Sequence, residues 1–151
     1  MARSVSATRV VPLAPEAALA LWSDPERWAS FVEGFARVVE QSGEWPHEGA
    51  KLVWESTPEG RGRVTERVVE TGPAVFATEV FDQSVHGRQA LRVLEDAEGS
   101  QVELSLDYTL AKAGPLGPLT DLFFIRRAQR DSLGRTLRRF AVEAEEEAGL
   151  R

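Results

Sequence analysis

Residues 35 to 110 alternate between apolar and polar side chains with a period of two, which is the spacing of a strand with one buried face. Turn residues interrupt this alternation five times, at 42–44, 58–60, 71–73, 82–84 and 98–100. Because the interruptions are short, consecutive strands should be antiparallel neighbours. The pattern therefore predicts a meander of six strands, at 35–41, 50–57, 62–70, 74–81, 87–95 and 101–110.

Shorter elements precede the meander. Residues 3–11 alternate loosely and predict a further strand. Pro15 should begin a short helix, because proline at the first helical position loses no hydrogen bond. Ser23 and Asp24 are candidate caps of a second short helix that starts at Pro25.

One long helix should follow the meander. Residues 119–147 keep helical spacing without a proline, after a stretch that is rich in glycine and proline. At 100° per residue, one face of this helix carries Leu119, Leu122, Leu133, Leu137, Phe140 and Ala144.

Composition indicates one soluble domain over residues 1–151 and restricts the classes of partner and cofactor that we expect. No apolar run reaches the roughly 20 residues that span a bilayer. The absence of cysteine excludes disulfides and thiolate metal sites and fits a cytoplasmic protein. His47 and His86 are expected in exposed loops, too far apart to indicate zinc, so we expect no metal and no other cofactor.

The charge pattern argues against a nucleic-acid partner. The net charge is −6, and the arginines between 126 and 139 are followed by a run of glutamates. Such a helix more often has a solvated face than a binding surface. We expect a monomer or homodimer.

The alternation in 101–110 indicates which face of the sheet is buried. Val102, Leu104, Leu106 and Tyr108 share one side, which must point inward. Pairing across the turn at Gly99 should then bring the inward residues of 87–95 beside them, with Leu91 near Leu106 and Gln89 near Tyr108. Continuing outward, Val80, Thr78 and Phe76 should oppose Gln89, Leu91 and Val93, and Glu66 should oppose Thr78.

The inward positions are apolar with some polar exceptions. They are Glu66, Thr78, Gln89 and Tyr108 on the strands, with Arg126 and Gln129 on the inward stripe of the long helix. An unpaired buried polar group costs about 1–3 kcal/mol, so a solid core rarely keeps this many. The pattern predicts a cavity between sheet and helix.

Large aromatic side chains gather beside the break at 23–25. Trp28, Phe31 and Phe35 are expected in a lid or end wall of the cavity, whereas Trp22 should anchor the first short helix. The alternative is an ordinary core between two short helices. Trp45 and Trp54 can line the entrance or pack beneath the hairpin, and its inward position makes Trp54 the better ligand contact.

Several phrases resemble the START/Bet v 1-like superfamily, in particular its bacterial polyketide cyclase/dehydrase and lipid-transport branch. They are APEAALALWSDPERW, GRGRVTERVVE and GPLGPLTDLFFIRRAQRDSLGRTLRRF. The resemblance covers nearly the whole chain and includes no invariant catalytic motif. It implies an α+β helix-grip fold, in which a seven-stranded curved antiparallel sheet wraps around a long C-terminal helix and two short helices follow the first strand.

The resemblance also implies a ligand cavity between the sheet and the last helix. Combined with the inward positions, it predicts contacts with a small hydrophobic ligand from Trp28, Phe31, Trp54, Glu66, Phe76, Thr78, Gln89, Leu91, Leu106, Tyr108, Arg126, Gln129 and Leu133.

Three of these residues are also candidate catalytic groups, each with an alternative. Glu66 is either a buried acid with a raised pKa, suited to proton transfer, or a solvated group at the rim of the sheet. Arg126 either pairs with Glu66 or a ligand carboxylate, or reaches out to the cavity mouth. Tyr108 either bonds Gln89 within the core or contacts ligand.

Two functions remain open at this point, and a third has little support. The first is a carrier that binds a lipid, isoprenoid or aromatic polyketide-like molecule. The second is an aromatase/cyclase or dehydratase that acts on a bound polyketone. An interaction module would need an exposed apolar patch, which the sequence does not reveal.

Overall fold

A computed structural model describes residues 3–58, 62–82, 85–110 and 126–149. The elements follow the predicted order. The strands are β1 (Arg3–Val11), β2 (Phe35–Ser42), β3 (Lys51–Ser56), β4 (Arg63–Thr71), β5 (Val75–Phe81), β6 (Val85–Asp96) and β7 (Gly99–Leu110). The helices are α1 (Pro15–Trp22), the 3-10 turn η1 (Pro25–Arg27), α2 (Trp28–Phe31) and α4 (Arg126–Glu147).

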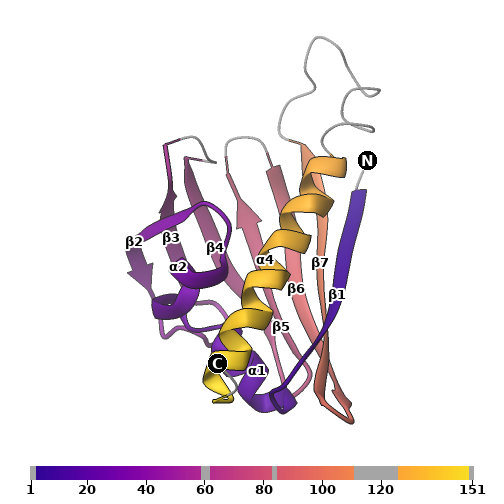
Figure 1. The fold of residues 1–151 in the computed structure, drawn as a ribbon. Coiled ribbons are helices and arrows are strands. Elements are labelled where there is room, and N and C mark those ends of the chain that lie inside the picture. The colour runs from indigo at the N-terminus through magenta and orange to yellow at the C-terminus, as the bar shows by residue number, and fades with distance from the viewer. Residues whose placement is uncertain (1–2, 59–61, 83–84, 111–125, 150–151) are drawn as a thin grey trace.

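The seven strands form one antiparallel sheet in the order β1-β7-β6-β5-β4-β3-β2. The described helices all lie on one face of this curved sheet, and α4 crosses it diagonally (Figure 1). Short helices α1 and α2 pack beside the lower half of α4. The predicted α+β helix-grip architecture is therefore confirmed.

Proline and aspartate begin the short helices as predicted. Pro15 occupies the first turn of α1, and the Asp24 carboxylate accepts a hydrogen bond from the Glu26 backbone N–H at 3.0 Å. The other candidate cap, Ser23, instead donates its hydroxyl to the Ala20 carbonyl at 3.4 Å. The expected second helix is split into η1 and the single turn of α2.

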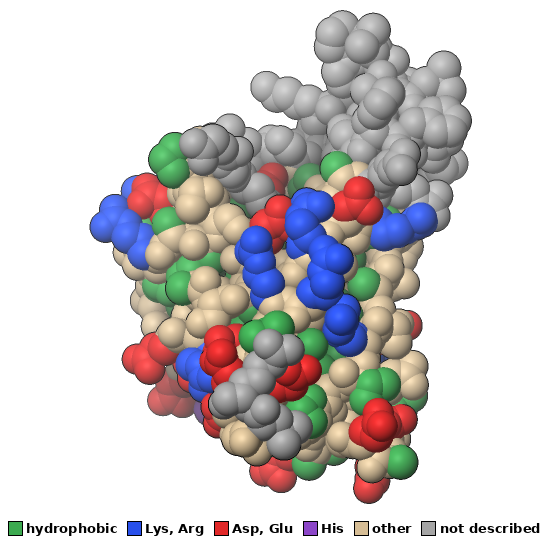
Figure 2. Space-filling view, in the orientation of Figure 1, with side chains coloured by type: hydrophobic (Ala, Val, Ile, Leu, Met, Phe, Trp, Pro, Cys, Tyr) green, Lys and Arg blue, Asp and Glu red, His purple; other side chains and the backbone are tan. Residues whose placement is uncertain are grey.

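Helix α4 has the predicted buried stripe as far as the structure describes it. Leu133, Leu137, Phe140 and Ala144 are buried against the sheet and the short helices. The expected residues 119–125 lie outside the described part of the chain. On the outer face, arginines 130, 135, 138 and 139 are exposed, and Figure 2 shows basic side chains gathered over this side of the molecule. The prediction of a solvated arginine-rich face is confirmed.

The inward face of the sheet is also as predicted, but the pairing of β6 with β7 is displaced by two residues. Gln89 pairs with Leu106 instead of Tyr108, and Leu91 pairs with Leu104. The turn is tighter than the sequence suggested, because Asp96 already pairs with Gly99 and only two residues separate the strands. The Asp96 carboxylate stabilises this turn by accepting the Glu98 N–H at 3.0 Å.

The predicted pairings of β5 with β6 and of β4 with β5 are also wrong by two residues. Thr78 pairs with Gln89 instead of Leu91, and Glu66 pairs with Val80 instead of Thr78. An irregularity between Val68 and Glu70 shifts the register of β4 against β5. Because side chains alternate with a period of two, a displacement of two residues keeps the same face inward.

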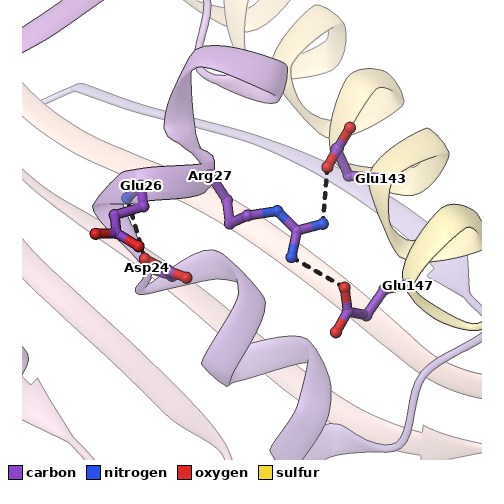
Figure 3. A network of polar contacts seen from close by, with 5 residues as sticks. All are labelled: Asp24, Glu26, Arg27, Glu143 and Glu147. Atoms are coloured by element: carbon purple, nitrogen blue, oxygen red, sulfur yellow. Dashed lines mark hydrogen bonds and ion pairs between the residues drawn. The ribbon is translucent and has the colours of Figure 1, made fainter.

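Arg27 joins η1 to the end of α4 (Figure 3). Its guanidinium donates to Glu147 and to Glu143, both at 2.9 Å. These hydrogen bonds, first that to Glu147 and then that to Glu143, raise the pKa of Arg27 above its ordinary value. The pair of contacts ties the segment before α2 to the helix that closes the sheet.

Replacing each of two glycines by alanine should change the free energy of unfolding in opposite directions. A Cβ on Gly87 would lie 2.5 Å from the Asp107 carbonyl oxygen and 2.9 Å from the Cβ of Tyr108, so Gly87→Ala should destabilise the protein by about 1–3 kcal/mol. Gly134 lies within α4 with nothing closer than 4 Å to such a Cβ, so Gly134→Ala should stabilise it by about 0.5–1 kcal/mol. Urea denaturation measures both, and equal changes would contradict the packing described for Gly87.

Candidate functional site

A small pocket lies between the inward face of the sheet and α4, with a volume of about 50 Å³. Strands β3 to β7, helix α4 and the segment from α1 to β2 all contribute to it. The lining residues are Trp22, Trp28, Val32, Glu33, Trp54, Glu66, Val80, Gln89, Leu104, Leu106, Gln129, Ser132, Leu133 and Thr136.

Three tryptophans form the aromatic side of the pocket. Trp22 ends α1, Trp28 begins α2 and Trp54 comes from β3. The indole N–H of Trp28 donates to the Trp22 carbonyl at 2.8 Å, and that of Trp54 donates to Glu66 at 2.7 Å. These hydrogen bonds fix the orientation of the Trp28 and Trp54 rings at the pocket.

Further aromatic rings support this wall from behind. Phe35 packs between Trp28 and Trp54, with ring centroids 5.9 and 5.3 Å away. Trp45 packs on Trp28 at 5.7 Å and donates its N–H to the Ser23 carbonyl. Of the three residues predicted for an aromatic end wall, Trp28 lines the pocket and Phe35 packs on it; their role as the wall of a ligand cavity stays a prediction.

Trp22 lines the pocket and Phe31 does not, whereas the sequence suggested the reverse for their contact with the cavity. Phe31 is fully buried in a cluster with Trp22 and Phe140, with centroids 5.2–5.4 Å apart. Trp22 anchors α1 in this cluster, as expected, but it also lines the pocket. Which of these two rings reaches the pocket depends on the path of the chain after the helix break at residues 23–25. The spacing of residues along the sequence does not reveal that path.

Glu66 is a buried carboxylate on the pocket wall, only 6% exposed. One of its oxygens accepts the Trp54 N–H at 2.7 Å and the other accepts the Thr78 hydroxyl at 2.9 Å. Glu66 is therefore buried and not a solvated group at the rim of the sheet, whereas its part in proton transfer stays a prediction. Hydrogen bonds across three strands offset part of the cost of burying this charge.

Helix α4 supplies a polar edge of the pocket. Gln129, Ser132 and Thr136 lie at spacings of three and four residues, on the side of α4 that lines the pocket. Gln89 adds an amide from β6. Sequence reasoning identified both glutamines but missed Ser132 and Thr136, although they flank Leu133 at helical spacing.

The connection between α2 and β2 closes the pocket toward α4. The Glu33 backbone N–H donates to the Thr136 hydroxyl oxygen at 3.2 Å, and Arg135 Nε donates to the Glu33 carboxylate at 3.0 Å. The hydrogen bond and the charge of Glu33 raise the pKa of Arg135 above its ordinary value. Sequence analysis missed Val32 and Glu33, because nothing in the spacing indicates which loop reaches the helix.

Not all of the predicted ligand contacts meet in this pocket. Trp28, Trp54, Glu66, Gln89, Leu106, Gln129 and Leu133 line it. Phe31, Phe76, Thr78, Leu91 and Tyr108 are buried but do not line it. Phe76 packs on Trp45 at 5.8 Å, and Thr78 donates a hydrogen bond to Glu66. The side chain of Arg126 lies outside the described part.

The volume restricts what the pocket can hold in this conformation. Water needs about 10–15 Å³ of such space, and a benzene site engineered in another protein measures about 150 Å³. At about 50 Å³, the pocket has room for a few water molecules. A drug-sized ligand typically occupies about 300 Å³ or more, so side chains or backbone must move to admit one.

The histidines do not take part in this site. His86 belongs to β6 instead of a turn, is exposed, and stacks on Phe81 with centroids 4.3 Å apart. His47 is exposed in the connection between β2 and β3. Within the described ranges, no three histidine, aspartate or glutamate side chains gather as a metal site would require. No helix in the described part of the chain is long and apolar enough to cross a membrane.

Comparison with known proteins identifies a family and a fold. Residues 2–145 match the family model described as polyketide cyclase/dehydrase and lipid transport. No curated protein matches the sequence significantly.

Among solved structures, the Zhui aromatase/cyclase of Streptomyces sp. R1128 is similar, with a TM-score of 0.79 and 20% identity over 98% of this chain and 96% of that one. Protein TTHA0849 of Thermus thermophilus has a TM-score of 0.75 and 17% identity, over 96% of this chain and 99% of that one. Norcoclaurine synthase of Thalictrum has a TM-score of 0.71 and 12% identity, over 98% of this chain and 97% of that one. At these identities the likeness concerns the fold alone.

Removing the Thr78 hydroxyl should lower the stability of the protein, because the buried Glu66 carboxylate then loses a hydrogen-bond donor. Thr78→Val keeps the side-chain shape but deletes a donor to Glu66, so it should destabilise the protein by about 1.5–3 kcal/mol. Thr65→Val, on the outer face of neighbouring β4, is the matched control and should change stability by less than about 0.5 kcal/mol. Chemical denaturation at neutral pH measures both, and equal losses would refute the role given to this hydroxyl.

Proposed function

The chain belongs to the polyketide cyclase/dehydrase and lipid transport family, and from this premise we propose that it binds a small, partly oxygenated aromatic molecule in the pocket beneath α4. Polyketide-like compounds have this chemistry. The observation that carries the proposal is that one pocket is lined both by three indoles, called here the indole wall, and by the polar edge.

The indole wall is suited to a flat ring. Burying one aromatic ring removes about 150 Å² from water, which corresponds to roughly 4 kcal/mol of favourable free energy. Trp22, Trp28 and Trp54 supply aromatic lining, and Leu104, Leu106 and Leu133 add apolar area. Apolar contact of this kind supplies affinity but does not orient the ligand.

The polar edge can supply the orientation. Within the described part of the chain, the side chains of Gln89, Gln129 and Ser132 make no hydrogen bond to protein groups, although they line the pocket. Two amides and one hydroxyl can both donate to and accept from ketone, phenol or alcohol groups. Ligand oxygens facing α4 would satisfy them.

This distribution favours an oxygenated aromatic over a long-chain lipid. A hydrocarbon tail in this space would leave the side chains of Gln89, Gln129 and Ser132 without polar partners, at a cost of about 1–3 kcal/mol for each unsatisfied group.

Tryptophan fluorescence tests the proposal directly, since three of the four tryptophans line the pocket. Titration with 1,8-dihydroxyanthraquinone should quench the emission saturably, whereas palmitate should not. Gln129→Leu should weaken binding of the quinone about five- to tenfold by removing one hydrogen-bond partner, and exposed Arg138→Gln should leave it unchanged.

Saturable palmitate binding without quinone binding would refute this ligand class. Native mass spectrometry of protein purified from its own host supplies an independent check, because a co-purifying molecule reveals its own composition. Empty protein across several growth conditions, together with no saturable quenching, would count against any small-molecule ligand.

A second candidate function, an aromatase/cyclase, is supported by the buried carboxylate of Glu66 on the pocket wall. In that reaction, Glu66 takes a proton from a carbon between two ketones of the bound chain. The carbanion attacks a third ketone carbon of the same molecule, closing a ring, and the resulting alkoxide takes the proton back. Loss of water from the new alcohol then leads toward an aromatic ring.

Glu66→Gln separates the two functions, because it keeps the shape and removes the base. For an enzyme, conversion of a synthetic poly-β-ketone thioester should fall at least 100-fold while quinone affinity changes less than about threefold. For a carrier, the wild-type protein should not accelerate ring closure above the buffer rate, and the variant should differ only in affinity. Chromatography of the products together with the fluorescence titration distinguishes these outcomes.

A further inference from the structure

The pocket must widen before it can hold a ring, and its walls differ in how easily they can move. Most lining residues belong to hydrogen-bonded strands or to the 22-residue helix α4. Val32 and Glu33 instead lie in the connection between α2 and β2. The inference below rests on the proposed ligand-binding function and concerns how the ligand enters.

The connection is a tight turn with a glycine at its third position. The Phe35 N–H donates to the Val32 carbonyl at 3.2 Å, and Gly34 has a φ of +76°. Both ends of the turn are anchored, since the Val32 N–H donates to Trp28 in α2 and the Gly34 carbonyl accepts from Thr57 after β3. Hinges in proteins are commonly a few loop residues of this kind.

Glu33 is the residue that attaches this turn to α4. Its backbone N–H donates to the Thr136 hydroxyl oxygen at 3.2 Å, and its carboxylate accepts from Arg135 at 3.0 Å. The Glu33 and Arg135 side chains are 30% and 43% exposed, so water and salt weaken the pair. An attachment of this strength is easily broken and reformed.

The rest of the short-helix segment is attached to α4 more firmly. Phe31 packs on Phe140 with centroids 5.2 Å apart, fully buried, and Arg27 binds two glutamates at the end of α4 (Figure 3). If the contacts of Glu33 break, the turn can therefore swing away from α4 while α2 stays in place. The gap would open beside Thr136 and Ser132, on the polar edge of the pocket.

We propose that the turn at Val32–Glu33 is the door of the pocket and that the Glu33–Arg135 pair, with the Glu33–Thr136 hydrogen bond, is its latch. Opening the latch admits a ligand between the turn and α4. Closing it returns Val32 and Glu33 to the pocket wall and shields the bound molecule from water.

Acrylamide quenching of tryptophan fluorescence tests the door without any ligand. Acrylamide is small and neutral, and Trp22, Trp28 and Trp54 line the pocket. Arg135→Gln should raise the lifetime-based quenching constant about twofold, while Arg138→Gln, another exposed arginine of α4, should leave it unchanged. In 0.5 M NaCl the wild-type constant should rise toward that of Arg135→Gln, which should itself not respond.

A reversible lock supplies the opposite test. The chain has no cysteine, so Glu33→Cys with Thr136→Cys introduces one possible disulfide at a point where the two segments approach within 3.2 Å. Oxidation should lower the quenching constant at least twofold below that of wild type, and reduction should restore it. Hydrogen exchange at the Glu33 amide should be faster in Arg135→Gln than in Arg138→Gln.

Equal quenching and equal exchange in Arg135→Gln and Arg138→Gln would overturn the proposal, as would an oxidised double variant that quenches like its reduced form. These outcomes are separate from a failure of the proposed function. A working door with no saturable quinone binding would refute the ligand class alone. Quinone binding that is equally fast in locked and unlocked protein would refute the door alone.

Discussion

One helix has to cover the inward face of a seven-stranded curved sheet, and the pocket follows from that constraint. In its C-terminal half, α4 packs against the sheet and the short helices through Leu137, Phe140 and Ala144, which are fully buried. Farther toward its start, Gln129, Ser132 and Leu133 border open space. Tryptophans from α1, α2 and β3 also line this space.

Glu66 connects this architecture to both candidate functions. A buried carboxylate is costly, and here its two oxygens are held by Trp54 and Thr78 from the strands on either side. The same bonds that make the acid tolerable also aim it at the pocket and orient one of the indoles. A carrier would use this group to recognise a ligand proton donor, and an enzyme would use it to move a proton.

The fold was predictable from the sequence in most respects, and the site in part. Alternation along the strands identified the inward residues correctly, including Glu66, because the identity of a face depends only on parity. The same property made the strand pairing wrong by two residues at Gln89, Thr78 and Glu66, since such a displacement leaves every face unchanged. Turn length and the irregularity within β4 decided the pairing, and side-chain alternation records neither.

The sequence by itself determined the order of elements, the buried face of each strand, and the polar groups that this face would carry. Only the tertiary structure decided that Thr78 would hold Glu66, that Trp22 would reach the pocket, and that Glu33 would meet α4. These three facts depend on how distant segments cross in space. Periodicity describes the neighbours of a residue along its own strand or helix, whereas a pocket is made between elements that are far apart along the chain.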